Sequence, residues 1–221
     1  MIVGRSMHER WLSNAYVVGD AAGGTAVFVD SGAPLGPLLE VVERERLTPT
    51  HLLRTHTHPD HVEHQDELCE RFGIPVVTGD LVAGGLTVRS LSLPGHADDG
   101  VAFVVNDELC FTGDVLFKDA VGGGPADVCR ASVMQLMELP PATRVLPGHT
   151  DETTIARELE HNPFVTYWRG VAPSLGEQVR VAGEAAELVV WSPDYDGNGK
   201  ALVQFPGGRE AIVGGSRVER G

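Results

Sequence analysis

The segment Thr55-His56-Thr57-His58-Pro59-Asp60-His61 places three histidines and one aspartate within six residues. Neutral imidazoles and carboxylates are the ligands that borderline divalent cations such as zinc prefer. His56 and His58 follow an apolar stretch that predicts a strand end, and their two-residue spacing lets both side chains reach one ion. Asp60 and His61 would face a second point in space. A polar turn that binds no metal is the alternative, because short motifs also match by chance.

Three later motifs each deliver a metal-binding side chain directly after a predicted strand. They are Pro94-Gly95-His96, Phe111-Thr112-Gly113-Asp114 and Leu146-Pro147-Gly148-His149. The glycine in each lets the backbone approach a site closely. With the first motif they supply five histidines and two aspartates, which is too many for one tetrahedral zinc and suits two ions. A carboxylate can bridge ions about 3.5–4 Å apart. The sequence therefore predicts two divalent metal ions, zinc first, with iron or manganese as alternatives.

Charge and composition exclude several classes of function. The 221 residues include 31 acidic and 17 basic side chains, a net charge of −14, so the chain has no cationic stripe for nucleic acid. No stretch approaches the roughly 20 apolar residues of a membrane span, and the first thirty residues lack an apolar signal segment. We expect a cytoplasmic protein with neither nucleic-acid nor membrane partners. Three widely spaced cysteines (Cys69, Cys110, Cys129) predict no disulfide framework.

The hydrophobic pattern predicts strands in both halves with helices between them. Asp60 is placed to cap a helix that runs to about Phe72, where Gly73 stops it. The other predicted elements are hairpins over 14–30 and 101–111, helices over 35–47, 132–139 and 151–161, and strands over 76–77, 87–93 and 144–146. Each half repeats the order of hairpin, helix, strand and histidine loop. A four-layer αββα sandwich of the α/β class fits this order, with the site on loops at the strand ends.

The pattern of apolar and turn-forming residues changes after about residue 170. Short apolar runs at 179–181, 188–191, 201–205 and 211–213 alternate with turns rich in Gly, Pro, Asn and Asp. This pattern predicts a small C-terminal all-β barrel of SH3 or Tudor type. The domains are therefore expected at 1–170 and 172–221. The small module could dimerise the chain, cap the site or bind a partner.

The four motifs in this order resemble those of the metallo-β-lactamase-fold hydrolases, and within them the glyoxalase II-like branch. The resemblance covers about residues 1–170 and includes two further stretches, Thr153-Thr154-Ile155 and Asn162-Pro163-Phe164. It implies that His56, His58 and His96 bind one metal, that Asp60, His61 and His149 bind a second, and that Asp114 bridges the two.

The resemblance also implies an activity. A metal-bridging hydroxide would attack the carbonyl of a small acyl substrate, with a thioester as the first expectation because a thiolate leaves readily. Asp60 would orient the nucleophile. Asp30 is either a partner for a ligand histidine or a plain strand-end carboxylate. Hydrolysis of lactones or esters, and a mononuclear-iron persulfide dioxygenase activity, are the alternatives.

This sequence differs from the glyoxalase II-like pattern at positions that bear on which substrate is bound. The run Val121-Gly122-Gly123-Gly124-Pro125 replaces the usual Ile-Gly-Arg after the aspartate motif, and it predicts an open or mobile pocket wall. The third motif continues as Ala97-Asp98-Asp99-Gly100, and the usual residues that grip glutathione are not evident. Asp98 or Asp99 could bind a cationic group, or lie in a solvated turn.

Overall fold

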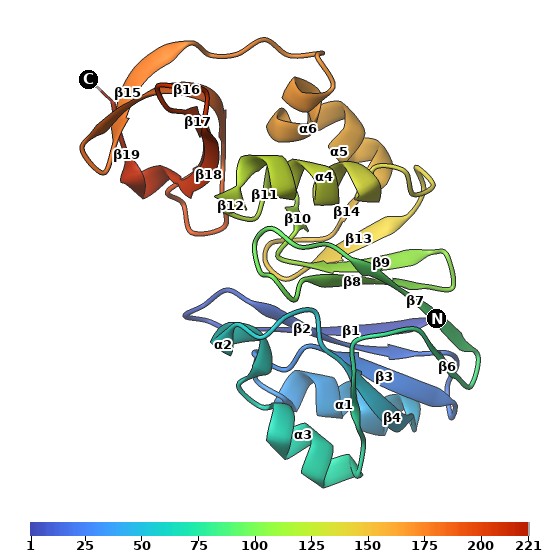
Figure 1. Ribbon diagram of the computed structural model, residues 1–221. Helices are drawn as coiled ribbons and strands as arrows, with labels where there is room; N and C mark the ends of the chain where they lie inside the picture. The colour runs from blue at the N-terminus through green and yellow to red at the C-terminus, as the bar shows by residue number, and fades with distance from the viewer. Residues whose placement is uncertain (221) are drawn as a thin grey trace.

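Two sheets pack face to face in the computed structural model, which describes residues 1–220 (Figure 1). The first has the order β1-β2-β3-β4-β5, in which β3, β4 and β5 are parallel and the others antiparallel. Its strands are β1 (Ile2–Met7), β2 (Asn14–Gly19), β3 (Thr25–Val29), β4 (Thr48–Leu53) and β5 (Val76–Val77). The second has the order β14-β13-β9-β8-β7-β6, with β9 parallel to β13. Its strands are β6 (Leu81–Ala83), β7 (Leu86–Ser92), β8 (Val101–Val105), β9 (Leu109–Gly113), β13 (Arg144–Pro147) and β14 (Thr153–Thr154).

Successive residues of a strand point to opposite faces of its sheet, and this alternation explains how the layers form. In β2, Val18 faces the opposite sheet while Val17 faces the outer helices, and Val27 and Phe28 divide in the same way in β3. The core between the sheets also takes Phe103 and other residues of β7, β8 and β9. Helices α1 (Gly36–Glu45), α2 (Pro59–Val62) and α3 (Gln65–Phe72) lie beside the first sheet. Helices α4 (Ala126–Leu136), α5 (Ile155–His161) and α6 (Pro163–Trp168) cover the second. The layers are those of the expected αββα sandwich.

Several predicted helix boundaries were wrong. The helix expected to start at Asp60 is broken into α2 and α3, and His58, with an extended backbone, is the N-cap in place of Asp60. The helix expected over 132–139 is α4, which begins at Ala126 directly after Pro125. A short hairpin of β10 (Leu116–Phe117) and β11 (Ala120–Val121) precedes it and was not predicted.

The glycine run before α4 is tightly packed, which corrects the prediction of an open wall. A Cβ on Gly122 would lie 2.0 Å from the Asp114 carbonyl oxygen and 2.9 Å from the His96 Cβ. A Cβ on Gly124 would lie 2.4 Å from the Gly95 carbonyl oxygen. The missing side chains let this segment press against the loops that carry two of the predicted metal ligands.

The C-terminal strands form a six-stranded sheet of order β12-β18-β17-β16-β15-β19. Its members are β12 (Gly124–Pro125), β15 (Glu177–Val181), β16 (Glu184–Ser192), β17 (Lys200–Gln204), β18 (Glu210–Gly214) and β19 (Val218–Arg220), with a 3₁₀ turn at Gly215–Arg217. The strands of this region agree with the sequence pattern, but the SH3- or Tudor-like barrel is not confirmed. Within residues 1–220, β12 pairs with β18 alone and β19 with β15 alone, so these two strands lie at opposite ends of the sheet and no pairing closes it. The predicted module 172–221 ends at Gly221, which lies outside the described residues.

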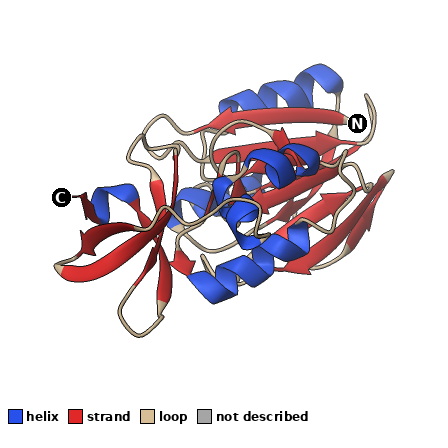
Figure 2. Cartoon of the chain, turned by 90° about the horizontal axis from the view of Figure 1, so that it is seen from above, coloured by secondary structure: helices blue, strands red, loops and turns tan. Residues whose placement is uncertain are grey.

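The C-terminal sheet shares a core with the helices over the second sheet. Val190, Leu202 and Ile212 belong to the same buried cluster as Val133 of α4 and Phe164 of α6. In Figure 2 the C-terminal strands lie to one side of those helices. The packing predicts that the two parts stabilise each other. Within residues 1–220, no helix is long and apolar enough to cross a membrane.

Removing a side chain from this shared core should destabilise the whole chain. Leu202→Ala is expected to lower the free energy of unfolding by about 2–5 kcal/mol, because Leu202 is fully buried. Val82→Ala is the control: Val82 is 73% exposed, so its change should stay within about 0.5 kcal/mol. Denaturant titration followed by circular dichroism measures both. Two separate transitions, with only one shifted by Leu202→Ala, would show that the parts fold independently.

Candidate metal centre

Five strands, two from the first sheet and three from the second, end at one edge of the sandwich. β3 and β4 are parallel, β9 and β13 are parallel, and β7 and β9 share a direction because β8 is antiparallel to both. The carboxyl ends of parallel strands are where open sheets place ligands. Each predicted site residue follows one of these ends. Asp30 follows β3, His96 follows β7, Asp114 follows β9 and His149 follows β13. The segment of residues 55–61, called the heptad below, follows β4.

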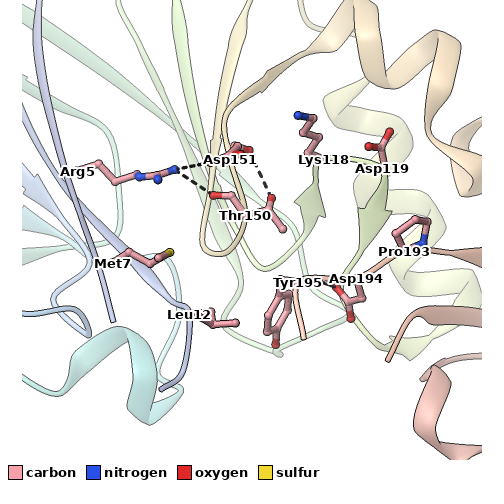
Figure 3. A pocket seen from close by; sticks show the side chains of 10 residues that line it. All are labelled: Arg5, Met7, Leu12, Lys118, Asp119, Thr150, Asp151, Pro193, Asp194 and Tyr195. Carbon is pink, nitrogen blue, oxygen red and sulfur yellow. Dashed lines mark hydrogen bonds and ion pairs between the residues drawn. The ribbon is translucent and has the colours of Figure 1, made fainter. Parts of the chain in front are cut away.

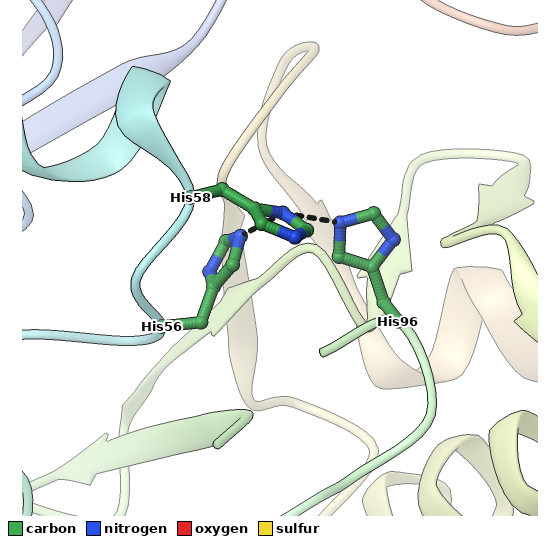
Figure 4. Close-up of side chains that lie close together, drawn as sticks. All are labelled: His56, His58 and His96. Carbon is green, nitrogen blue, oxygen red and sulfur yellow. Dashed lines mark hydrogen bonds between the residues drawn. The ribbon is translucent and has the colours of Figure 1, made fainter. Parts of the chain in front are cut away.

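The first group of side chains is formed by three histidines. The His58 Nδ1 atom lies 3.0 Å from His56 Nε2 and 3.0 Å from His96 Nε2. Figure 4 shows His56 and His96 each directing a ring nitrogen at His58. These residues could hold one ion through three ring nitrogens. This is the set that the resemblance assigns to the first metal.

The second group is formed by Asp60, His61 and His149. The Asp60 Oδ2 atom lies 3.6 Å from His61 Nε2 and 3.4 Å from His149 Nε2. Their ligand atoms are close enough together to hold one ion. The break between α2 and α3 leaves Asp60 and His61 in a single short turn. His61 is fully buried, whereas the Asp60 side chain is 24% exposed.

Asp114 connects the two groups. Its Oδ2 atom lies 3.4 Å from His96 Nε2 and 3.3 Å from His149 Nε2, and its Oδ1 atom lies 3.2 Å from His61 Nε2. The side chain is only 6% exposed. A carboxylate in contact with histidines of both groups is the arrangement that a bridging ligand needs.

Hydrogen bonds on the far side of the rings orient the histidines. The His149 Nδ1 atom donates to the Leu12 carbonyl oxygen at 3.0 Å, and His96 Nδ1 donates to the Gly123 carbonyl oxygen at 3.2 Å. Bonds of this kind fix the tautomer and leave the other nitrogen free to bind a metal.

Asp30 holds side chains of both groups in place through hydrogen bonds. Its Oδ2 atom accepts from His61 Nδ1 at 2.9 Å and from the Thr55 hydroxyl at 2.7 Å, while Oδ1 accepts from the Thr55 N–H at 2.8 Å. The Thr55 hydroxyl in turn lies 3.1 Å from His56 Nδ1. Asp30 has a left-handed backbone with φ of 54°. Of the two alternatives that the sequence left open, the contacts favour a partner for a ligand histidine.

Three buried atoms show that a cation fits the site. Among residues 1–220, His61 Nε2, Asp114 Oδ1 and His149 Nε2 find no hydrogen-bond partner, and all three lie where the two groups meet. Buried polar atoms are seldom left unpaired without a reason such as an ion. The donor set of imidazole nitrogens and carboxylate oxygens suits divalent zinc, iron or manganese.

The electrostatics of the two groups differ. Burial, together with the His61 charge, lowers the pKa of His56 to about 4, and burial also lowers the pKa of His96. Burial has the same effect on His149, but the Asp114 and Asp60 carboxylates outweigh it and raise the pKa of His149 to about 9. The Asp114 and Asp30 carboxylates likewise raise the pKa of His61. Asp114 itself is held well below its usual pKa, despite its burial, by His61 and His149.

Two aromatic residues lie at the site that the sequence pattern did not predict. Tyr195 of the C-terminal sheet stacks on the His149 ring, and Phe117 of β10 contacts the edges of both rings. A tyrosine inside an Asp- and Gly-rich turn gave no signal.

Asp98 and Asp99 are exposed, which favours the solvated turn. His64 lies near Glu63 and Glu67 and joins neither group.

The layered fold and this strand-end cluster define a protein with paired His/Asp groups for divalent metal. Residues 8–91 match the family described as the metallo-beta-lactamase superfamily. An uncharacterized protein of Mycobacterium leprae is 33% identical over 69% of this chain and 93% of its own length. A probable metallo-hydrolase of Bacillus subtilis, YqgX, is 30% identical over 62% of this chain and 85% of its own. A hydroxyacylglutathione hydrolase of Rhodopseudomonas palustris is 33% identical over 61% of each chain.

Solved structures agree with the sequence relatives. ETHE1 from Myxococcus xanthus superposes with a TM-score of 0.66 and 31% identity, covering 74% of this chain and 84% of that one. The BLEG-1 B3 metallo-beta-lactamase gives a TM-score of 0.68 and 28% identity, covering 75% and 100%. The chain belongs to the metallo-β-lactamase superfamily.

Replacing the buried Asp30 carboxylate should weaken metal binding. Asp30→Asn keeps the shape and tolerates the left-handed backbone, but its amide nitrogen cannot accept both the His61 and Thr55 hydrogen bonds. We expect affinity for the second ion to fall about 10–100-fold, measured by competition with a chromophoric chelator. Asp98→Asn, at an exposed carboxylate, is the matched control. Equal affinities in both variants would contradict the supporting role of Asp30.

The raised histidine pKa values predict how pH affects the metal-free protein. Protonated His149 pairs with Asp114 and Asp60 in the folded state, so its pKa rises from 6.5 to about 9. This contribution to stability is complete below pH 6.5 and is lost as pH rises toward about 9. With chelator present, the free energy of unfolding should therefore fall across that interval. The zinc-loaded protein should not show the fall, because a ligand histidine is already deprotonated. A metal-free stability that rises over the same interval would contradict this assignment.

Proposed function

We propose that the protein is a di-metal hydrolase of the glyoxalase II-like branch that cleaves small acyl thioesters. The observation that carries the proposal is the contact of one buried carboxylate, Asp114, with histidines of both metal-binding groups. The name of the R. palustris relative, a hydroxyacylglutathione hydrolase, supports the branch. The name of the B. subtilis relative supports a metallo-hydrolase more broadly.

We propose that His56, His58 and His96 hold one divalent ion, that Asp60, His61 and His149 hold the other, and that Asp114 bridges them. Ions bound there would lower the pKa of a shared water and polarise an acyl carbonyl. Zinc is our first choice, with iron or manganese as alternatives, because all three accept this mixture of nitrogen and oxygen donors.

Asp60 is the residue to which we assign the orientation of the nucleophile. It is the most exposed carboxylate of the cluster, at 24% against 6% for Asp114 and 3% for Asp30. A water that approaches the second group therefore meets Asp60 first. Burial raises the pKa of Asp60, but the His149 imidazole, 3.4 Å from its Oδ2 atom, and the charge of His61 outweigh burial and lower the pKa below its usual value. Asp60 is thus a carboxylate at neutral pH and can accept a hydrogen bond from the attacking water.

The same property favours a thioester as the substrate. A carboxyl with a lowered pKa is a weak general acid, so Asp60 gives little help to a leaving group that must be protonated. A thiol has a pKa near 8.5 and departs as the thiolate, whereas an alkoxide or an amine needs a proton. Thioesters are therefore favoured over oxygen esters, lactones and amides.

Matched substrates test the proposal. The zinc-loaded protein should hydrolyse S-acetyl-N-acetylcysteamine at least 10-fold faster, in kcat/KM, than the corresponding oxygen ester. Chelation should abolish the activity and zinc should restore it. His61→Gln should also abolish it, while His64→Gln is the matched control, since His64 belongs to neither group.

Two results would contradict the proposed function. One is faster hydrolysis of the oxygen ester or of a lactone. The other is a single bound iron per chain with sulfite formed from a persulfide.

A further inference from the structure

The loop between β16 and β17 reaches from the C-terminal sheet to the metal centre and is fixed at both ends. Near its start, Asp194 pairs with Lys200 at its end, with 2.8 Å between Oδ2 and Nζ. Both side chains are buried, at 2% and 11% exposure. The Ser192 hydroxyl donates to the Asp119 carbonyl oxygen, which ties the loop to the β10–β11 hairpin. A buried ion pair that closes a short loop restrains the five residues between its partners.

One of these residues is Tyr195, and its ring lies flat on His149. The ring centroids are 3.9 Å apart and the planes differ by 4°. Phe117 meets the tyrosine edge-on at 5.6 Å. The C-terminal part of the chain thus contacts a side chain of the second metal-binding group directly.

The phenol of Tyr195 is free to donate a hydrogen bond. Within residues 1–220 the only hydrogen bond of Tyr195 is that of its backbone N–H to Asp194 Oδ1, at 2.9 Å. A tyrosine hydroxyl, with an ordinary pKa of about 10, is protonated through the neutral range and can act as a donor.

A cavity of about 470 Å³ begins at the same place. Leu12, whose carbonyl oxygen accepts from His149, lines it together with Thr150 and Tyr195. Met7 and Pro193 add apolar surface, and the rest of the lining is charged: Arg5, Lys118, Asp119, Asp151 and Asp194. Figure 3 shows the tyrosine ring at one end of this cavity, with its oxygen pointing away from Lys118. The volume lies in the range of small-molecule sites, so the cavity can take the part of an acyl substrate that does not react.

We propose that Tyr195 is a substrate-contacting residue of the metal centre, which donates its hydroxyl to the acyl group and sets the size of acyl chain that the cavity accepts. The inference rests on the proposed function for the identity of the substrate. It also gives the C-terminal sheet a role: it supplies one wall of the active site.

Three variants of the full, zinc-loaded chain test the proposal. Tyr195→Phe keeps the stacked ring and loses only the hydroxyl. It should lower kcat/KM for acetyl and hexanoyl thioesters of one thiol about 10-fold, with zinc content unchanged. Tyr195→Ala should in addition change the hexanoyl-to-acetyl ratio at least 5-fold, because the wall is gone. Tyr167→Phe is the control, since Tyr167 lies on α6 away from this cavity. A Phe variant within twofold of wild type, or an Ala variant with an unchanged ratio, would overturn the proposal.

A binding measurement separates this inference from the proposed function. If the wild-type protein hydrolyses no thioester, the proposed function fails, and calorimetric titration with acetate and hexanoate then decides the inference alone. Hexanoate should bind wild type at least 10-fold more tightly than it binds Tyr195→Phe or Tyr195→Ala at equal zinc content. Equal affinities would overturn the role of Tyr195. If the Ala variant loses zinc, the Phe variant decides.

Discussion

A buried carboxylate, Asp114, is the charge around which the site is arranged. An ionised group at 6% exposure is costly unless opposite charge or metal compensates it. His61, His96 and His149 surround it at 3.2–3.4 Å. In the metal-free protein, protonated histidines supply the compensation, which is why the pKa of His149 rises to about 9 and that of His61 rises with it. Divalent ions would take over this role, so metal binding exchanges protons for cations at a preformed negative centre.

Holding this charge in place requires the strand ends to meet at one edge. The parallel pairs β3–β4 and β9–β13 bring Asp30, the heptad, Asp114 and His149 together. Asp30 then fixes His61 directly and His56 through Thr55. Glycines allow the close approach: a Cβ on Gly148 would lie 2.3 Å from Asp114 Oδ1, and one on Gly32 would lie 1.6 Å from the Asp60 carbonyl oxygen. Side chains at either position would displace the loops that carry the second group.

The sequence predicts the site better than its surroundings, for physical reasons. Histidines and aspartates placed after strands carry their chemistry in their residue type, so His56, His58, Asp60, His61, His96, Asp114 and His149 could be named, and the structure brings them together. The αββα layers follow from period-two burial in β2 and β3. Other features depend on tertiary contacts that leave no local pattern. The pairing of β12 with β18 decides the shape of the C-terminal sheet, and the start of α4 depends on how the glycine run packs. Tyr195 lies far from the motifs in sequence, and only the packing of the sheet against α4 and α6 places it on His149.

Anomalous X-ray diffraction from zinc-loaded crystals tests the central claim most directly, because it locates each ion without reference to activity. Two zinc peaks per chain are expected, one among His56, His58 and His96 and one among Asp60, His61 and His149. Asp114 should lie in contact with both. A single peak, or a second peak that leaves Asp60, His61 and His149 without metal, would contradict it.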